Sequence, residues 1–282
     1  MCKRGIKSLA LLCSLLICLG SFGLCSSAAA EKKRIAVLPF KSSTSLARAN
    51  DLGGSVANLL TVKLVKNKNY DVVEREELQR ILQEQRFGLT GVVDAETAVE
   101  VGKMVGAAYS VFGSVEYADV QFMQVYRRTD AEAVVKLSYR LVDNTTGKIL
   151  EAEEVEGQIW DRGIERSSDS KKALLVRAAE RAIATLANKI NRQNPLLGSV
   201  MKIDGRRVYI SLGSADGIEE GAVCTIYEEG EPLYDPLRGI VVDVVEEKLA
   251  ECFVQEVHEK YSVAQLRQAK RTLKVGDKVK YF

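Results

Sequence analysis

The sequence is poor in the residues from which enzymes most often build a reactive centre. It contains a single histidine, His258, and no pair of cysteines spaced as Cys-x-x-Cys. A transition-metal site needs a cluster of His and Cys ligands, so we predict no metal site. The sequence also lacks a phosphate loop, a dinucleotide-binding glycine motif and a Gly-x-Ser-x-Gly nucleophile motif. These absences predict a protein that is not an enzyme and that binds no cofactor.

A surplus of charge of one sign is also missing. The chain has 40 basic and 38 acidic residues, and its first 30 residues contain three of the basic ones and none of the acidic ones. Residues 31–282 therefore carry 37 basic and 38 acidic side chains. Proteins that bind nucleic acid usually carry a basic surplus, so we predict no nucleic-acid partner.

Residues 1–30 have the pattern of a secretory signal peptide. A positively charged start precedes an apolar stretch, residues 9–19, which is too short to span a bilayer comfortably. Signal peptidase accepts only small side chains at the first and third residues before the cut. Ala28 and Ala30 meet this requirement, so we predict cleavage between Ala30 and Glu31.

The alternative to this cut is lipid attachment at Cys25. A lipoprotein motif needs a small residue directly before the modified cysteine, and here that residue is Leu24. The pattern therefore favours a free protein of the periplasm, which could associate with the outer membrane but does not span it once the signal peptide is removed. Removal of 30 residues from the 282 leaves 252, enough for one large domain or two ordinary ones.

Only two cysteines, Cys224 and Cys252, lie outside the predicted signal peptide. Each lies in a run of residues typical of a strand, and the predicted compartment allows disulfides to persist. They could form a disulfide if the two strands are neighbours. The alternative is a pair of buried thiols that pack as small apolar side chains.

Residues 31–192 have the pattern of an α/β (α+β) domain with a mixed sheet and packed helices. The run Ile35–Leu38 is apolar without alternation, which is typical of a strand covered on both faces. Residues 133–143 alternate between apolar and polar, as in a strand with one face in water. The predicted strands are 34–40, 70–73, 109–115, 133–143 and 148–160, and the predicted helices are 52–64, 75–85, 97–104 and 174–190.

Residues 193–198 contain Pro195 and are predicted to be a linker. Residues 199–282 then consist of short strand-like runs and turn pairs such as Asp204-Gly205. Such units close small β-barrels, so we predict a small all-β domain, an SH3-like barrel.

The predicted strand 148–160 is very acidic and ends in the only tryptophan, Trp160. Alternation places Glu154 and Glu156 on one face and Glu151 and Glu153 on the other. A solvated edge strand explains these charges better than a catalytic carboxylate pair. Trp160 is expected to pack against the long helix, and the alternative is that it anchors a partner.

Three segments carry a resemblance to a known family: RIAVLPF (34–40), YDVVEREELQRILQEQRFG (70–88) and DAETAVEVGKMVGAAYSVFGSV (94–115). Together they resemble the curli-secretion CsgG-type domain, which is similar to the N-terminal domain of TolB, over about residues 34–191. The second half of the chain, residues 198–282, which begins with GSVMKIDGRRVYISLGSADGIEEG and ends with KVGDKVKYF, resembles the C-terminal domain of the flagellar assembly protein FlgT. The layout of the two domains is most similar to a shortened FlgT.

The resemblance implies an outer-membrane pore only if the chain can build β-hairpins that cross the membrane. Each membrane-spanning strand needs about nine to eleven residues, with apolar side chains at alternate positions facing the lipid. Residues 117–132 are the best candidate segment, and we predict that they are too short and too charged for a whole hairpin.

We therefore expect a periplasmic, non-enzymatic assembly or scaffold protein that forms homo-oligomers, including rings, and docks onto proteins of an envelope machine. A role like that of FlgT at the flagellar basal body is the specific expectation. The alternatives are a CsgG-type component of curli export at the outer membrane and an accessory regulator of peptidoglycan synthesis.

Overall fold

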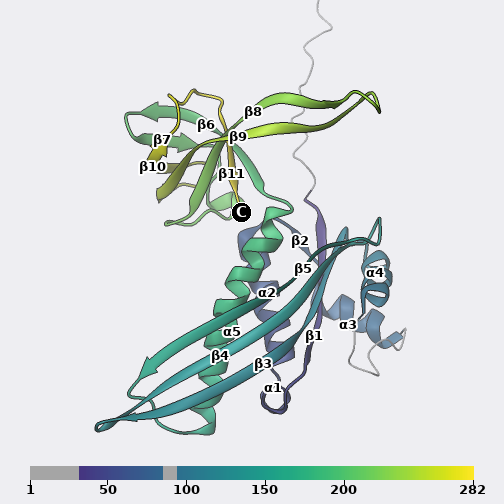
Figure 1. Ribbon diagram of the computed structural model, residues 1–282, viewed down its shortest axis with the longest axis vertical. Helices are drawn as coiled ribbons and strands as arrows, with labels where there is room; N and C mark the ends of the chain where they lie inside the picture. The colour runs from purple at the N-terminus through teal and green to yellow at the C-terminus, as the bar shows by residue number, and fades with distance from the viewer. Residues whose placement is uncertain (1–31, 85–93) are drawn as a thin grey trace, which may run out of the picture. The chain divides into compact units, whose positions relative to one another are not determined.

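The computed structural model describes residues 32–84 and 94–282, which form an α/β part followed by an all-β part (Figure 1). The predicted cleavage site at Ala28, Ala30 and Glu31 lies outside the described residues. The α/β part contains β1 (Arg34–Ser42), α1 (Ser45–Ala49), α2 (Leu52–Asn67), β2 (Asp71–Val72), α3 (Arg75–Glu84), α4 (Ala95–Met104), β3 (Tyr109–Val125), β4 (Arg128–Asp143), β5 (Ile149–Arg162) and α5 (Ser168–Arg192). The all-β part contains β6 (Leu196–Asp204), β7 (Arg207–Ile210), β8 (Val223–Asp235), β9 (Ile240–Val257), β10 (Ser262–Ala269) and β11 (Lys278–Tyr281).

The α/β part is built on one mixed sheet with the strand order β2-β1-β3-β4-β5. Strand β1 pairs in parallel with β2 and β3, whereas β3, β4 and β5 are antiparallel to one another. This confirms the predicted mixed sheet. The change from parallel to antiparallel pairing occurs where the sequence changes from continuous apolar runs to alternation.

Helices cover the two faces of this sheet unequally (Figure 1). Helices α2 and α5 pack on one face and enclose the larger core, to which Ile35 and Val37 of β1 contribute. Helices α3 and α4 enclose a smaller core at one end of the other face, with Ala36 and Leu38. The consecutive residues of β1 therefore alternate between two cores, as the unbroken apolar run predicts.

Strands β3 and β4 are longer than the sequence suggested. They form a hairpin that turns at residues 126 and 127, and residues 117–132 are its distal half. The segment is thus part of a hairpin whose strands continue from the sheet, and the statement that it is too short and too charged for a whole membrane hairpin stays a prediction. Val120 and Phe122 of the distal half pack on the larger core. Among the described helices, none is both long enough and apolar enough to cross a bilayer.

The all-β part is a closed barrel with the strand order β10-β7-β6-β11-β8-β9. Its core is formed by inward side chains from every strand, including Val208, Ile226, Val254 and Val279. The small barrel is thus confirmed, while its SH3-like class stays a prediction. Strand β6 begins at Leu196, so the linker predicted at residues 193–198 is shorter than expected.

Candidate functional site

The candidate site is the face of β3, β4 and β5 that points away from α5. Most side chains that face α5 are buried along these strands, whereas those on the opposite face are exposed or half-buried outside the part that α3 and α4 cover. Helices α3 and α4 cover only the end of this opposite face. We call the uncovered remainder the open sheet face, which comprises Ser114, Glu116, Tyr117, Glu132, Lys136, Ser138, Arg140, Glu154, Glu156, Gln158 and Trp160.

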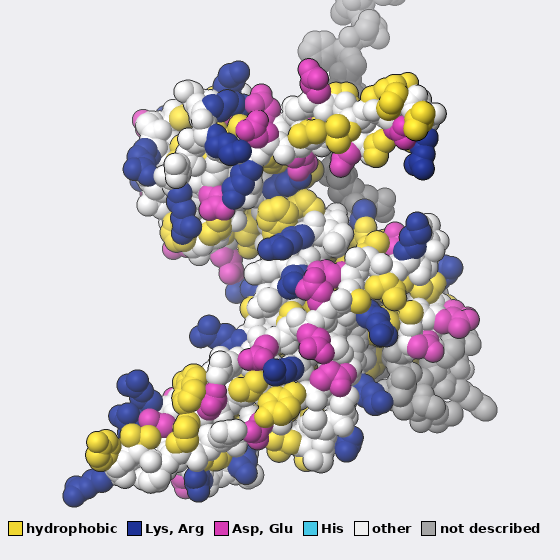
Figure 2. All heavy atoms as spheres, in the orientation of Figure 1, with side chains coloured by type: hydrophobic (Ala, Val, Ile, Leu, Met, Phe, Trp, Pro, Cys, Tyr) yellow, Lys and Arg dark blue, Asp and Glu magenta, His cyan; other side chains and the backbone are white. Residues whose placement is uncertain are grey.

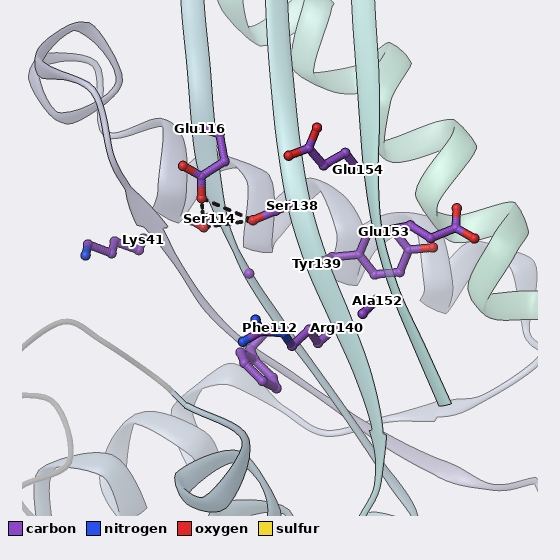
Figure 3. A pocket seen from close by; sticks show the side chains of 11 residues that line it. Lys41, Phe112, Ser114, Glu116, Ser138, Tyr139, Arg140, Ala152, Glu153 and Glu154 are labelled. Carbon is purple, nitrogen blue, oxygen red and sulfur yellow. Dashed lines mark hydrogen bonds between the residues drawn. The ribbon is translucent and has the colours of Figure 1, made fainter. Parts of the chain in front are cut away.

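A cleft of about 620 Å³ lies on the open sheet face next to β1 (Figure 3). Its lining contains two basic side chains, Lys41 and Arg140, and the carboxylates of Glu116 and Glu154. Strand pairing sets the relative positions of the lining residues. Ser114, Ser138 and Glu154 lie directly opposite one another on β3, β4 and β5. The cleft is therefore polar and carries both signs of charge.

Glu116 owes its position to an irregularity in β3. Val115 lies opposite Leu137 and Tyr117 lies opposite Lys136, so Glu116 is an extra residue in the ladder, a β-bulge. The bulge places its carboxylate over the two serines shown in Figure 3. Sequence analysis missed Glu116, because a bulge interrupts the alternation from which faces are assigned.

The carboxylate of Glu116 accepts hydrogen bonds from both neighbouring hydroxyls. The Ser114 hydroxyl donates to Oε1, the Ser138 hydroxyl donates to the same oxygen over 3.1 Å, and the two hydroxyl oxygens are 2.9 Å apart. The hydrogen bond from Ser114 is the main cause that lowers the pKa of Glu116, with a smaller contribution from Ser138, although partial burial opposes it. A carboxylate with a lowered pKa is a weak base. The arrangement therefore suits the binding of a polar or cationic group better than proton transfer.

Trp160 lies on the open sheet face and is 60% exposed. The prediction that it packs against the long helix was wrong. Val155, Gly157 and Ile159 face α5, so side-chain alternation turns Trp160 to the other face, opposite Glu132 of β4. The alternation of side chains along β5 predicts this orientation from the sequence, because Gly157 and Ile159 share one face and Trp160 therefore lies on the other. An exposed tryptophan is a candidate anchor for a partner.

The acidic residues of β5 lie where alternation predicted them. Glu154 and Glu156 are on the open sheet face, and Glu156 forms an ion pair of 2.9 Å with Lys136 of β4. Glu153 is on the opposite face and pairs with Lys189 of α5. Strand β5 is an edge of the sheet, and its 14 residues pair with β4 alone among the described strands. Charged side chains on such an edge disfavour unselective strand pairing.

The other predicted site residues lie in the barrel. Cys224 and Cys252 are directly opposite each other on β8 and β9, both buried and with free thiols. Directly opposed Cα atoms lie about 4.5–5.5 Å apart, within the range that a disulfide requires. The hydrogen bond between the two thiols, together with burial, raises the pKa of Cys224. The disulfide and its alternative, a pair of buried thiols, both stay predictions.

His258 follows β9 and is exposed, and its ring stacks on Tyr261 with the centroids 4.3 Å apart. In the described part of the chain, no group of three or more His, Cys, Asp or Glu side chains is arranged to hold a metal ion.

Comparison with known proteins places the α/β part in context. Residues 22–190 match the family model for the curli production assembly/transport component CsgG. Among solved structures, a PelC dodecamer from Paraburkholderia phytofirmans is 18% identical, with 54% of this chain and 89% of that chain covered and a TM-score of 0.31. A lipoprotein from Neisseria meningitidis is 16% identical, with 57% and 99% covered and a TM-score of 0.32. The C-terminal domain of LpoB from Escherichia coli is 16% identical, with 45% and 82% covered and a TM-score of 0.31. No curated protein sequence gives a significant match.

Proposed function

The chain belongs to the CsgG family, and from this premise we propose that it is a non-enzymatic assembly or scaffold protein of the bacterial envelope. Its work in this proposal is to bind proteins, including further copies of itself. The observation that supports the proposal most directly is the open sheet face with Trp160 exposed on it.

The chemistry of the open sheet face fits a protein partner. Aromatic side chains and arginines are enriched at the centres of protein interfaces, and this face presents Trp160, Tyr117 and Arg140. The face also carries polar groups, including the Lys136–Glu156 ion pair, whose lysine lies directly opposite Tyr117. The cleft around Glu116 adds hydrogen-bonding groups whose positions are set by the strand register. Rigid strands hold these groups in place, so a partner would bind a preformed surface.

A more specific proposal concerns the envelope machine that the protein serves. We favour service at the flagellar basal body, in the manner of FlgT. The support is the layout of the chain, because a closed β-barrel follows the α/β part, as the resemblance to FlgT implies. The second candidate is curli export, and the description of the matched family favours it.

Site-specific photo-crosslinking in living cells tests the scaffold proposal. Benzoylphenylalanine replaces Trp160 in one strain and Tyr126, which lies at the exposed β3–β4 turn, in the control strain. We expect a discrete adduct from position 160 that is absent from position 126. Its identification by mass spectrometry as a second copy or as an envelope-machine protein supports the proposal. The same faint, heterogeneous adducts from both positions would contradict it.

A deletion strain separates the two machines. Loss of swimming together with incomplete basal-body rings supports the flagellar role, whereas loss of surface curli with normal swimming supports the export role. An adduct with a peptidoglycan synthase in the crosslinking experiment would move the protein to the regulation of cell-wall synthesis instead.

A further inference from the structure

Strands β8 and β9 continue well beyond the barrel as a two-stranded ribbon (Figure 1). Strand β11 pairs with β8 only as far as Tyr227, and β10 pairs with β9 only from Ala250 onward. Between these points the two strands pair with each other alone among the described strands. We call residues 230–245 the arm. A two-stranded ribbon is marginally stable on its own in water, so the arm calls for an explanation.

The arm carries a dense group of exposed apolar side chains, visible as the yellow atoms along the ribbon in Figure 2. Of the 21 large apolar side chains that are exposed among the described residues, eight lie between positions 233 and 245. They are Leu233, Tyr234, Leu237, Ile240, Val241, Val242, Val244 and Val245. Single exposed apolar residues are ordinary, but a contiguous group of this kind marks an interaction surface.

The apolar residues occupy both faces of the ribbon and its tip. Tyr234 lies opposite Val241 on one face. Leu233 is the neighbour of Tyr234 in the same strand and therefore points to the other face, where it lies opposite Asp243 at the base side of the tip. Leu237 forms the tip and is 96% exposed. A protein that docks on one face would leave the other in water, whereas a lipid layer surrounds both faces and the tip together.

The charges at the tip of the arm fit an uncharged lipid surface, whereas the acidic residues of the arm that form no ion pair with a described residue, Glu231 and Asp243, lie nearer its base. Asp235 and Arg238 at the tip neutralise each other, with Oδ2 of Asp235 lying 3.6 Å from Nε of Arg238. The other carboxylate oxygen of Asp235 accepts the backbone N–H of Leu237 over 2.9 Å and that of Arg238 over 3.3 Å. The tip therefore carries no net charge and needs no anionic or cationic partner. Gly239, with φ +67°, closes this turn in a conformation that favours glycine.

Charged residues limit the depth to which the arm can enter a lipid layer. Asp243 lies three residues beyond Ile240, which is about 10 Å at the rise of a β-strand. At the base of the arm, four glutamates pair with basic residues of the barrel: Glu228 with Arg271, Glu229 with Lys278, Glu246 with Lys280 and Glu247 with Lys270. The apolar end is thus about as long as the depth, about 5–10 Å, to which interfacial segments enter a bilayer.

We propose that the tip of the arm, residues 233–242, inserts into the interfacial layer of a zwitterionic phospholipid bilayer and holds the barrel against it. The insertion is shallow and does not span the membrane, because a spanning strand needs about nine to eleven residues. Residues 233–235 and 240–242 give each strand of the tip only three. Tyr234 fits this position, since tyrosine favours the boundary between lipid and water. This anchor is additional to the protein-binding role proposed above.

Fluorescence quenching by brominated lipid tests the insertion at one position at a time. Trp160→Phe in the secreted full-length protein removes the only tryptophan, and Leu237→Trp then places a single reporter at the tip. The matched control is Val275→Trp, because Val275 is 67% exposed in another loop of the barrel. With vesicles of brominated phosphatidylcholine, we expect fluorescence at position 237 to fall about twofold or more and position 275 to stay unchanged. The comparison of quenching at positions 237 and 275 does not depend on how the rest of the protein attaches to the vesicles.

A second variant tests the energetic role of the tip. Leu237→Asp should leave the barrel folded, because the side chain contacts mainly solvent, and should lower the partition coefficient onto phosphatidylcholine vesicles about tenfold. Unquenched fluorescence at position 237 in vesicle-bound protein would overturn the proposal. Fluorescence at position 237 that shifts to the blue with protein concentration alone, without quenching by lipid, would also overturn it and assign the arm to a second copy of the chain.

Discussion

Gly157 of β5 permits the close contact between the sheet and helix α5, and its replacement by alanine should weaken that contact. A Cβ atom at position 157 would lie 1.9 Å from the carbonyl oxygen of Ala178 and 2.6 Å from the backbone nitrogen of Ala182. Both atoms belong to the helix backbone, so no side-chain rotation can relieve the overlap. Helix α5 would have to move away by about 1.5 Å to restore ordinary contact.

The cost of this movement follows from what α5 covers. The inner face of the helix is fully buried in the larger core through Leu174, Ala178, Ala182 and Leu186. A gap of about 0.5–1 Å already forfeits a quarter to a half of the dispersion attraction between packed atoms. Overpacking usually costs about 1–3 kcal/mol, and we expect Gly157→Ala to cost about 3 kcal/mol because the obstacle is backbone. For a chain of this size, that corresponds to a fall of about 6–12 °C in Tm.

Thermal unfolding monitored by circular dichroism measures this effect against a matched control. Gly147→Ala also adds one methyl group, but no atom lies within 4 Å of the added Cβ, and the residue has φ +71°. Its cost is the left-handed conformation alone, about 1 kcal/mol. Adding Ala178→Gly to Gly157→Ala should not restore stability, because it removes only a side chain. The reasoning is refuted if Gly157→Ala lowers Tm no more than Gly147→Ala does.

Three further outcomes are expected. The backbone N–H of Thr97 donates to Asp94 over 2.8 Å and lowers the pKa of this helix cap below 3.8. The stabilisation from the ionised cap is therefore present above pH 3.8 and lost as the pH falls through the lowered pKa, so Asp94→Ala should cost about 1 kcal/mol in urea unfolding at pH 7 and progressively less as the pH is lowered below 3.8. Cys224 and Cys252 should be linked in the secreted protein, with reduction costing about 3–4 kcal/mol; uptake of two alkyl groups by the denatured, unreduced protein would show that they are not. Trp160→Glu should lower the weight-average sedimentation coefficient of the purified protein, and an unchanged coefficient beside that of wild type would argue against self-association through the open sheet face.

The sequence predicts most elements of the α/β part because their burial follows simple periods. The unbroken run in β1 predicts a strand between two cores, and Ile35 and Ala36 lie in different cores. Alternation correctly assigns the faces of β4 and of the glutamates in β5. The alanines of the long helix predict close packing, and Ala178 lies against Gly157. These features depend on local patterns that the tertiary structure does not override.

The candidate site could not be predicted as well, because it depends on pairing between distant segments. The bulge at Glu116 is defined only by the strand opposite it, so the cleft and its serine pair have no local pattern.

The arm was missed for a different reason. Its sequence Ile240–Val245 is largely apolar without regular alternation, which is typical of a buried strand, and only the pairing shows that no other described strand covers it.

The two exposed surfaces differ enough in chemistry that their roles can be separated by experiment. The open sheet face is polar, carries the Lys136–Glu156 ion pair and has one exposed tryptophan on a single side of the sheet, as a protein interface does. The tip of the arm carries apolar side chains on both faces and no net charge, as a lipid anchor does. Trp160 and Leu237 lie on different elements and share no partner, so their effects should add. A protein with both Trp160→Glu and Leu237→Asp should therefore show the sedimentation coefficient of the first variant and the vesicle binding of the second. A stronger loss of either property in the double variant would show that membrane attachment and assembly are coupled, because only a shared interface makes one substitution amplify the other.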